Sequence, residues 1–247
     1  MDIYKRMQEL KEMRWVDLTH GFDETTPRWP GFKKVKKEIY LDFDQYPVRA
    51  HLYTFPGQIG THIDAPAHGN INGMTIDEIN LKDCLLPLHV IDCSKSVESN
   101  YDYALTVDDI LKYENKYGKI LEGSFIAMRS DWYKRWDDVD RFLNKDNCGK
   151  SHYPGWSIEA LKFLVDNRNI AAIGHEPLDT DPPNLESQKN FKGEVYILNQ
   201  DRYQIEVMKN LDKVPEFGAI IFNIFPKQCG GTGFPVRSFA IFETKIQ

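Results

Sequence analysis

The sequence predicts an α/β fold in which helices cover part of a mixed β-sheet. Three observations support this prediction. Residues 15–60 are rich in strand patterns, the middle of the chain alternates helix and strand patterns, and the residues after 219 return to strands. This order of elements is typical of a mixed sheet with flanking helices.

The individual elements follow from local patterns. Residues 2–13 are expected to be helical, because Ile3, Met7 and Leu10 recur at helical spacing. This helix would pack either on a partner subunit or on its own domain. Helices are also expected to start near residues 106 and 157, where Thr and Ser are typical N-terminal caps. Apolar and β-branched runs predict strands at residues 40–55, 86–93, 125–128, 170–173, 219–222 and 236–242.

Composition narrows the class of protein. The 247 residues, 41% hydrophobic and 28% charged, indicate a globular chain, and its net charge of −6 argues against nucleic acid as a partner. A short aromatic and basic stretch at 129–136 does not change this expectation. No signal peptide is visible, and no apolar run approaches the roughly 20 residues of a membrane helix, so we expect no membrane partner. The four cysteines lack a Cys-x-x-Cys pair, which favours reduced thiols in a cytoplasmic protein.

Residues 58–68, Gln-Ile-Gly-Thr-His-Ile-Asp-Ala-Pro-Ala-His, carry the strongest functional pattern. Gln58, His62, Asp64 and His68 occupy even positions, so an extended chain would place them on one face. A carboxylate and an imidazole two residues apart can reach the same cation. We interpret the segment as part of a metal-binding active site. A polar loop with a buried histidine is the alternative, which a bare His-x-Asp would favour.

The segment resembles the signature of the cyclase family of metal-dependent hydrolases, which reads His-x-Gly-Thr-His-x-Asp-x-Pro-x-His. This chain matches every fixed position except the first, where Gln58 replaces a histidine. The resemblance runs over nearly the whole chain. It implies one domain, 1–247, with a β/β/α architecture of the swivelling type. Family members commonly associate, so it also implies a homodimer or higher homo-oligomer, to which residues 1–14 offer a possible contact.

The resemblance also implies the metal ligands. Residues 203–212 resemble the family's segment Ile-Glu-Asn-Leu-x-Asn-Leu-Asp, in which the glutamate is a ligand. This makes Glu206 a ligand beside His62 and Asp64. His68, at the end of the motif, would be the catalytic general acid/base, a role that suits a group titrating near neutral pH. A structural histidine that caps a turn is the alternative for His68.

Two positions differ from the family's formamidases, which have ligand histidines there. Gln58 would be a ligand or a hydrogen-bond donor beside one, and Glu194 occupies the second position, twelve residues before Glu206. Amides and carboxylates are harder donors than imidazole. We therefore expect one divalent metal ion, Zn²⁺ or Mn²⁺.

Further segments resemble the family less specifically. His20 and Trp29 lie in segments like its N-terminal strand and substrate-side loop, and Glu176 and Asp179 follow a predicted strand. These residues, with Glu194, would bind the substrate or support the ligands; solvated loop acids are the alternative for Glu176 and Asp179. Arg237 would bind a substrate carboxylate or brace an acidic loop.

The predicted function is hydrolysis, by metal-activated water, of an amide, formamide or lactone bond in a small cyclic or aryl substrate. Two alternatives stay open. One is kynurenine formamidase proper, and the other is a non-catalytic small-molecule binding protein of the same fold. A ring-closing reaction at the same polarised carbonyl is also compatible with the sequence.

Overall fold

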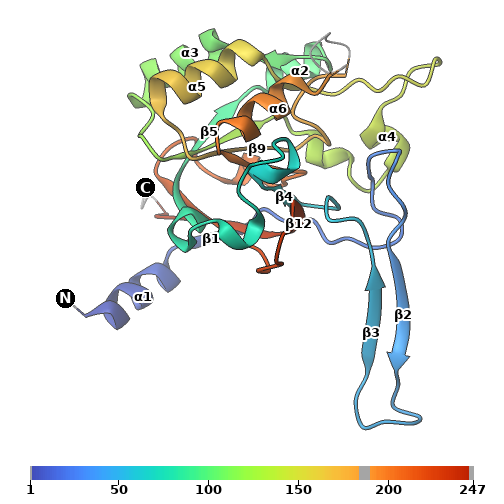
Figure 1. Cartoon of the computed structure of the whole chain (residues 1–247). Helices are drawn as coiled ribbons and strands as arrows, with labels where there is room; N and C mark the ends of the chain where they lie inside the picture. The colour runs from blue at the N-terminus through green and yellow to red at the C-terminus, as the bar shows by residue number, and fades with distance from the viewer. Residues whose placement is uncertain (1, 184–189, 245–247) are drawn as a thin grey trace.

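The computed structural model describes residues 2–183 and 190–244 and is built on a nine-stranded mixed sheet (Figure 1). Six helices accompany the sheet among these residues, so the predicted α/β class is confirmed. In spatial order the strands are β1 (Arg14–Asp17), β13 (Arg237–Phe242), β11 (Ala219–Ile224), β5 (Leu85–Asp92), β7 (Phe125–Arg129), β9 (Ala172–His175), β10 (Tyr203–Glu206), β4 (His62–Asp64) and β12 (Gly233–Pro235).

The sheet is parallel at its centre and antiparallel at its flanks. Strands β5, β7, β9 and β10 are parallel neighbours, whereas the remaining pairs are antiparallel. Only Val236 separates β12 from β13, although these strands lie near opposite edges of the sheet. The sheet must therefore curl until its two edges come close, and Val236 N donates to the carbonyl of Thr61 at 2.9 Å across this closure.

Helices α3 (Val107–Tyr117), α5 (Ile158–Arg168) and α6 (Lys192–Asn199) lie together on the outer face of the sheet (Figure 1). The predicted caps are present: Thr106 and Ser157 accept hydrogen bonds from backbone amides in the first turn of α3 and α5. The shorter helices are α2 (Ser94–Ser99) and α4 (Val139–Leu143).

Alternation along the central strands divides the core into two layers. Ile126 and Met128 of β7 pack under the helices, whereas Phe125 and Ala127 pack inside the curl of the sheet. On β4 and β10, Ile63 and Ile205 also face the inside of the curl. The polar residues that alternate with them therefore face the helix side.

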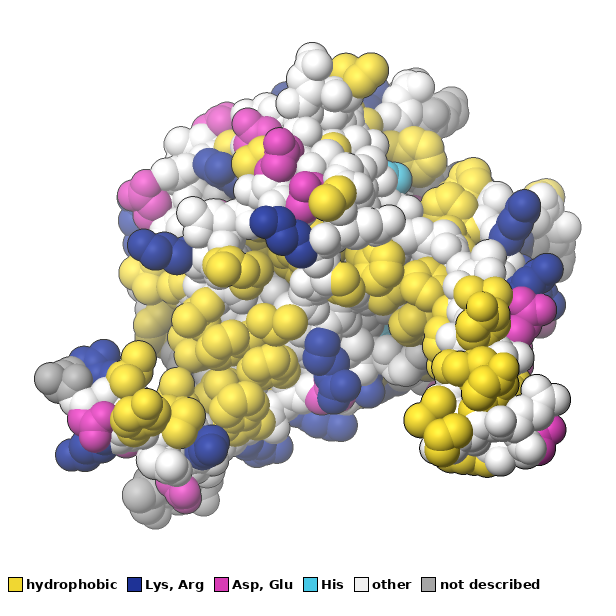
Figure 2. Space-filling view, turned by 60° about the horizontal axis from the view of Figure 1, so that its bottom comes forward, with side chains coloured by type: hydrophobic (Ala, Val, Ile, Leu, Met, Phe, Trp, Pro, Cys, Tyr) yellow, Lys and Arg dark blue, Asp and Glu magenta, His cyan; other side chains and the backbone are white. Residues whose placement is uncertain are grey.

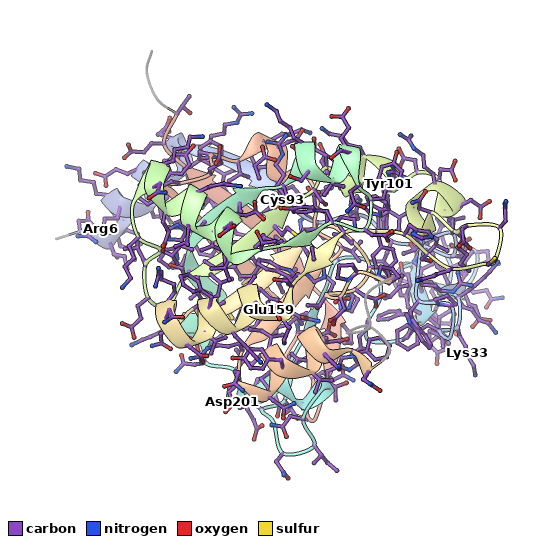
Figure 3. All side chains as sticks on the ribbon, turned by 90° about the horizontal axis from the view of Figure 1, so that it is seen from above. Arg6, Lys33, Cys93, Tyr101, Glu159 and Asp201 are labelled. Carbon is purple, nitrogen blue, oxygen red and sulfur yellow. The ribbon has the colours of Figure 1, made fainter. Side chains whose placement is uncertain are left out.

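Two elements project from this body. Strands β2 (Lys36–Leu41) and β3 (Ala50–Thr54) form a hairpin, here called the arm, and α1 (Ile3–Glu12) projects on the opposite side (Figure 1). Seen from above, Arg6 of α1 and Lys33 at the base of the arm mark opposite ends of the molecule (Figure 3). The predicted helix at 2–13 is confirmed, whereas the strand pattern at 40–55 is split by the turn of the arm. A pair of short strands, β6 (Ala104–Leu105) and β8 (Gly155–Trp156), completes the structure.

The outer face of β1, β13 and β11 is largely apolar and partly exposed, and it also carries the ion pair of Asp17 and Arg237. Trp15 stacks on Phe239 at 5.2 Å between ring centroids, and Phe239 stacks on Phe222 at 4.9 Å. Trp15 and Ile224 keep about half of their surface in solvent. We call these four apolar residues the bare face. Figure 2 shows apolar side chains gathered on α1, on the arm and on the surface between them.

Candidate active site

The pairing of β4 with β10 creates the polar centre of the site. The antiparallel register places Gln204 opposite Asp64 and Glu206 opposite His62. Because residues two apart on a strand share a face, all four side chains point to the same side of the sheet. All four are buried. Two segments about 140 residues apart in the chain thus contribute two residues each.

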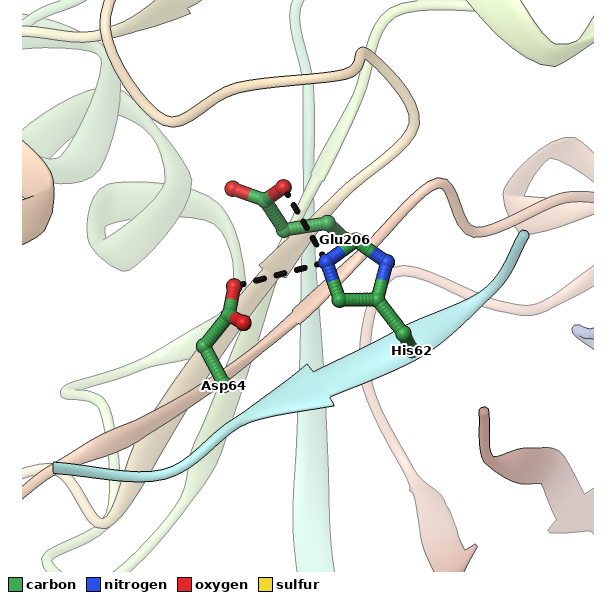
Figure 4. Close-up of side chains that lie close together, drawn as sticks. All are labelled: His62, Asp64 and Glu206. Atoms are coloured by element: carbon green, nitrogen blue, oxygen red, sulfur yellow. Dashed lines mark ion pairs between the residues drawn. The ribbon is translucent and has the colours of Figure 1, made fainter. Parts of the chain in front are cut away.

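His62, Asp64 and Glu206 form a compact group (Figure 4). His62 Nε2 lies 3.5 Å from Asp64 Oδ2 and 3.5 Å from Glu206 Oε2. The other ring nitrogen, Nδ1, is 2.9 Å from the carbonyl oxygen of Gly60. A carbonyl can only accept, so Nδ1 carries a hydrogen, and Nε2 is the ring nitrogen that would give its lone pair to a bound cation. This is the tautomer and the outer contact that a metal-binding histidine requires.

The charges in this group are crowded and buried. Burial opposes ionisation of Asp64, but the neighbouring His62 outweighs it and lowers the pKa of Asp64 to about 2. Burial, and after it Asp64, raises the pKa of Glu206 well above its usual range and that of Glu194 to about 9. Burial likewise raises the pKa of Asp179 to about 6. These carboxylates repel one another in a dry site, so a bound cation would relieve a real electrostatic cost.

A second group shares Asp64. His68 and Glu194 place donor atoms within 4.8 Å of one another and of an Asp64 oxygen, and His68 Nε2 lies 3.5 Å from Glu194 Oε1. Gln58 Nε2 lies 3.2 Å from His68 Nδ1. An amide nitrogen can only donate, so Nδ1 accepts, and in the neutral ring Nε2 carries the hydrogen. Gln58 thus contacts His68 directly and sits outside the group of His62, Asp64 and Glu206.

Local structure explains how Gln58 and His68 come into contact. The motif is extended only over β4, and from Pro66 to His68 it forms a 3-10 helix. The sequence predicted one extended face with Gln58, His62, Asp64 and His68. In the structure only His62 and Asp64 share such a face. Gly60 has φ of 61°, a left-handed conformation that glycine adopts without strain, and it turns the chain between Gln58 and β4.

The first turn of α6 holds Glu194 in position. Asp181 accepts hydrogen bonds from the backbone amides of Gly193 and Glu194 at 2.9 and 3.1 Å. A side chain on Gly193 would meet Asp181 Oδ1 at 2.9 Å from its Cβ, which explains the glycine. A carboxylate at the first turn of a helix is also favoured by the helix dipole.

The donor atoms suit a divalent cation. One imidazole nitrogen and several carboxylate oxygens converge, a set that both zinc and manganese accept. Asp64 Oδ1 is buried and has no hydrogen-bond partner within the described part of the chain. Buried carboxylate oxygens are rarely left without a partner, so this free oxygen supports a cation site.

The group opens into a cavity of about 290 Å³. Its polar end is formed by His62, Asp64, His68, Glu194 and Glu206. Its other walls are largely apolar, and no lysine or arginine is found among the described residues that line it. The remaining lining residues are Trp29, Phe32, Gln58, Gly69, Leu178, Asp179, Phe191 and Val195.

Comparison with known proteins identifies the family of the chain. A family model described as putative cyclase matches residues 16–182. The isatin hydrolase of Roseibium aggregatum is 34% identical over 188 residues, which cover 74% of this chain and 70% of that protein. The chain belongs to the cyclase family. The kynurenine formamidase of Geobacillus thermodenitrificans is 28% identical over 95 residues, 38% of this chain and 46% of that protein.

Solved structures of cyclase-family proteins have the same fold. Isatin hydrolase A from Labrenzia aggregata, bound to benzyl benzoate, superposes with a TM-score of 0.91 at 29% identity, over 98% of this chain and 99% of that one. An isatin hydrolase bound to the product analogue thioisatinate gives 0.90 at 28% identity, over 99% and 100%. The predicted family and fold are confirmed, and these relatives also confirm that the chain is a hydrolase.

The remaining predicted residues of this cyclase-family chain lie in different places. Trp29 and Asp179 line the cavity, and Asp179 accepts a hydrogen bond from the hydroxyl of Tyr153. His20 lies outside the cavity lining; its ring stacks on Trp136 at 4.1 Å, and its backbone amide donates to Thr61 beside His62. Burial lowers the pKa of His20 to about 3.

Glu176 and Arg237 also lie outside the cavity lining. Glu176 Oε2 accepts hydrogen bonds from the amides of Ser130 and Trp132 at 3.0 and 2.9 Å, so it braces the loop after β7. Burial raises the pKa of Glu176 to about 8. Arg237 is largely exposed and pairs with Asp17 at 2.9 Å, which joins β13 to β1.

Sequence reasoning did not single out several residues that touch the site. Gln204 and His175 contact Glu206, and Phe32 and Phe191 wall the cavity. Trp156 Nε1 lies 3.3 Å from His175 Nδ1 and donates to it, which turns the Nε2 of the neutral ring toward Glu206 Oε1 at 3.3 Å. The strand alternation two residues before Glu206 could have indicated Gln204. Phe32 and Phe191 carried no comparable signal in the sequence.

Proposed function

We propose that this chain is a metal-dependent hydrolase that cleaves an amide, formamide or lactone bond in a small cyclic or aryl substrate. The observation that carries the proposal is the buried group of His62, Asp64 and Glu206 at the end of an aromatic-walled cavity, next to His68. A bound divalent cation would polarise the substrate carbonyl and acidify water. The fitting donor set supports one ion, Zn²⁺ or Mn²⁺.

In the proposed mechanism the protein's own residues bind the substrate and move protons. Trp29, Phe32 and Phe191 would hold an aryl ring and exclude water from the carbonyl. His68 would carry a proton to the leaving nitrogen or oxygen through Nε2, since Nδ1 is occupied by Gln58. Glu194 faces the same Nε2, and once a bound cation has favoured its ionised form it would stabilise the charged ring while the proton is in transit.

The lining of the cavity favours a neutral cyclic aryl amide over N-formylkynurenine. N-formylkynurenine carries a free carboxylate, which usually needs a cationic side chain. The described lining contains acids and aromatic rings but no lysine or arginine, and Arg237 is engaged with Asp17. Likeness to isatin hydrolases across most of the chain supports the same choice.

A substrate panel tests the function. We expect the zinc- or manganese-loaded protein to hydrolyse isatin faster than N-formylkynurenine or simple lactones, and the metal-free protein to hydrolyse none of them. Metal analysis of the purified protein separates an enzyme from a binding protein of the same fold. Faster turnover of N-formylkynurenine would overturn the substrate choice, and absence of both metal and turnover would overturn the function.

We also propose that the protein forms a homodimer or higher homo-oligomer. Helix α1 has ten residues and none is buried, and its side chains Ile3 and Met7 are exposed. Helices this short are marginal in water without a packing surface. The bare face beside it is apolar as well. A second copy would cover both surfaces, because α1 leads directly into β1, which carries Trp15 of the bare face.

Light scattering at micromolar concentration tests this assembly. We expect at least twice the monomer mass for the wild type and a lower mass for Met7→Glu, which places a charge on the apolar stripe. Lys5→Glu, on the charged side of the same helix, is the matched control and should keep the assembly. A monomeric wild type would refute the proposal.

Two further expectations concern organisation and location. We propose that residues 1–247 act as one domain, because strands from Arg14 to Phe242 share one sheet. A cytoplasmic location is supported by the four free cysteines, of which Cys93 is buried. None of the helices in the described residues is long and apolar enough to cross a membrane.

A further inference from the structure

Gln204 is a buried amide surrounded by carboxylates. Its side chain is fully buried on β10, and its Nε2 lies 3.1 Å from Asp64 Oδ2 and 3.0 Å from Glu206 Oε1. The same nitrogen is 3.5 Å from Glu194 Oε1. One neutral donor therefore contacts a member of each of the two groups that could bind a cation. The sheet register explains this reach, because Asp64 is the cross-strand partner of Gln204 and Glu206 follows two residues later.

Thr180 determines which end of the amide faces the acids. Its hydroxyl lies 2.7 Å from Gln204 Oε1 and donates to it. Thr180 is itself held in place, because its carbonyl accepts from the backbone amide of Trp156 at 2.8 Å. With Oε1 occupied by a donor, the NH₂ group must point at Asp64 and Glu206. The opposite orientation would bring Oε1 against two carboxylates and would leave the Thr180 hydroxyl only its longer contact with Glu206 Oε1 at 3.4 Å.

The hydrogen bonds select which carboxylate oxygens stay available. Glu206 Oε1 takes the bond from Gln204, so Oε2 is the oxygen that remains turned to His62 Nε2 at 3.5 Å. Asp64 Oδ2 takes the other bond and also lies 3.5 Å from His62 Nε2, whereas Oδ1 has no hydrogen-bond partner among the described residues. A neutral donor can hold both acids without the full positive charge of a lysine, which would compete with a cation for them.

We propose that Gln204 is a positioning residue that holds Asp64 and Glu206 in the geometry required for a divalent cation, with its own amide oriented by Thr180. This inference rests on the proposed metal-dependent function. Partners that orient metal ligands typically contribute 10–100-fold in metal affinity. The effect of Gln204 should therefore show in cation binding itself, independently of turnover.

The test measures Zn²⁺ and Mn²⁺ affinity of the metal-free full-length protein by competition with a chromophoric chelator. Gln204→Met keeps the length of the side chain and removes the donor, and we expect about 10–100-fold weaker binding. Thr180→Val should weaken binding by a smaller factor, whereas Thr180→Ser keeps the hydroxyl and should bind as the wild type does.

Asn223→Leu is the matched control. Asn223 is also a fully buried amide; it donates to the Tyr203 hydroxyl at 3.1 Å and accepts from Ser238 at 2.7 Å, away from the acids. It should lower the melting temperature of the metal-free protein and leave cation affinity unchanged. If disturbing any buried amide weakened cation binding, Gln204→Met and Asn223→Leu would lose affinity alike. That result would overturn the proposal.

The remaining outcomes are also decisive. Wild-type affinity in Gln204→Met overturns the role of Gln204 while leaving the proposed function intact. If Gln204→Met does not fold, Thr180→Val decides, and unchanged affinity there overturns the proposal. A wild type that binds neither ion overturns the proposed function, and the positioning role with it.

Discussion

The outer face of the sheet differs sharply between its two ends. At the end formed by β9, β10 and β4, helix α6 covers the face, and the buried side chains there include His62, Asp64, Gln204 and Glu206. At the end formed by β1, β13 and β11, the face is largely apolar, yet Trp15 and Ile224 remain about half exposed. Usual burial is thus inverted at both ends: charge lies inside, and apolar surface lies outside.

Each end therefore lacks a different partner. Buried carboxylates that repel one another are costly unless a cation or a proton neutralises them. Exposed apolar surface that forms one contiguous patch is typical of an interaction site. One sheet can present both kinds of surface, because the side chains at each end are determined by the residues of the strands there. The core layer under the helices and the one inside the curl supply the stability.

Asp64→Ala should abolish both metal binding and turnover. Asp64 belongs to both candidate ligand groups, so its loss removes an oxygen from each. Metal content by atomic emission and turnover on the substrate panel measure the two effects. If the variant keeps one equivalent of metal, Asp64 is not a ligand.

His68→Ala should retain metal and lose about 10²–10⁴-fold in turnover, the usual contribution of a general acid/base. The group of His62, Asp64 and Glu206 is intact in this variant, so the cation should stay bound. Metal stoichiometry, melting temperature and turnover are measured on the same sample. Loss of metal would make His68 a ligand, and a rate loss no greater than the stability loss would make it structural.

Ile221→Ala should lower the free energy of unfolding by about 2–5 kcal/mol, the usual cost of a large-to-small change in a core. Ile221 is fully buried inside the curl on β11, away from the polar end. Chemical denaturation measures the loss, and metal affinity of the folded variant should equal that of the wild type. A loss of affinity comparable to that of a ligand variant would mean that the two ends are coupled.

The metal-free protein should lose stability as the pH rises from about 5 to about 9. The pKa of Glu194 is raised from 4.5 to about 9 and that of Asp179 from 3.8 to about 6. Between the unfolded and folded pKa values the folded state holds more protons than the unfolded state, so stability falls with pH. Melting temperatures with and without saturating metal should diverge toward high pH. Parallel curves would show that these acids do not face the cation.

Much of the site could be predicted from the sequence, because its signals are local. Spacing within residues 58–68 identified His62, Asp64 and His68 as candidates, and the family resemblance added Glu206 and Glu194. The caps at Thr106 and Ser157 likewise follow from adjacent residues. Such features depend on side chains a few positions apart, which interact in the same way in any fold that keeps the local backbone.

Only the tertiary structure decided how these pieces meet. The register that places Gln204 opposite Asp64 joins residues 140 positions apart, and no local pattern specifies it. The closure of the cavity by Phe32 and Phe191, and the pairing of Arg237 with Asp17, depend on the same long-range packing. Strand pairing and sheet curvature are set by the whole core, because each strand gains its stability from neighbours that are distant in the chain.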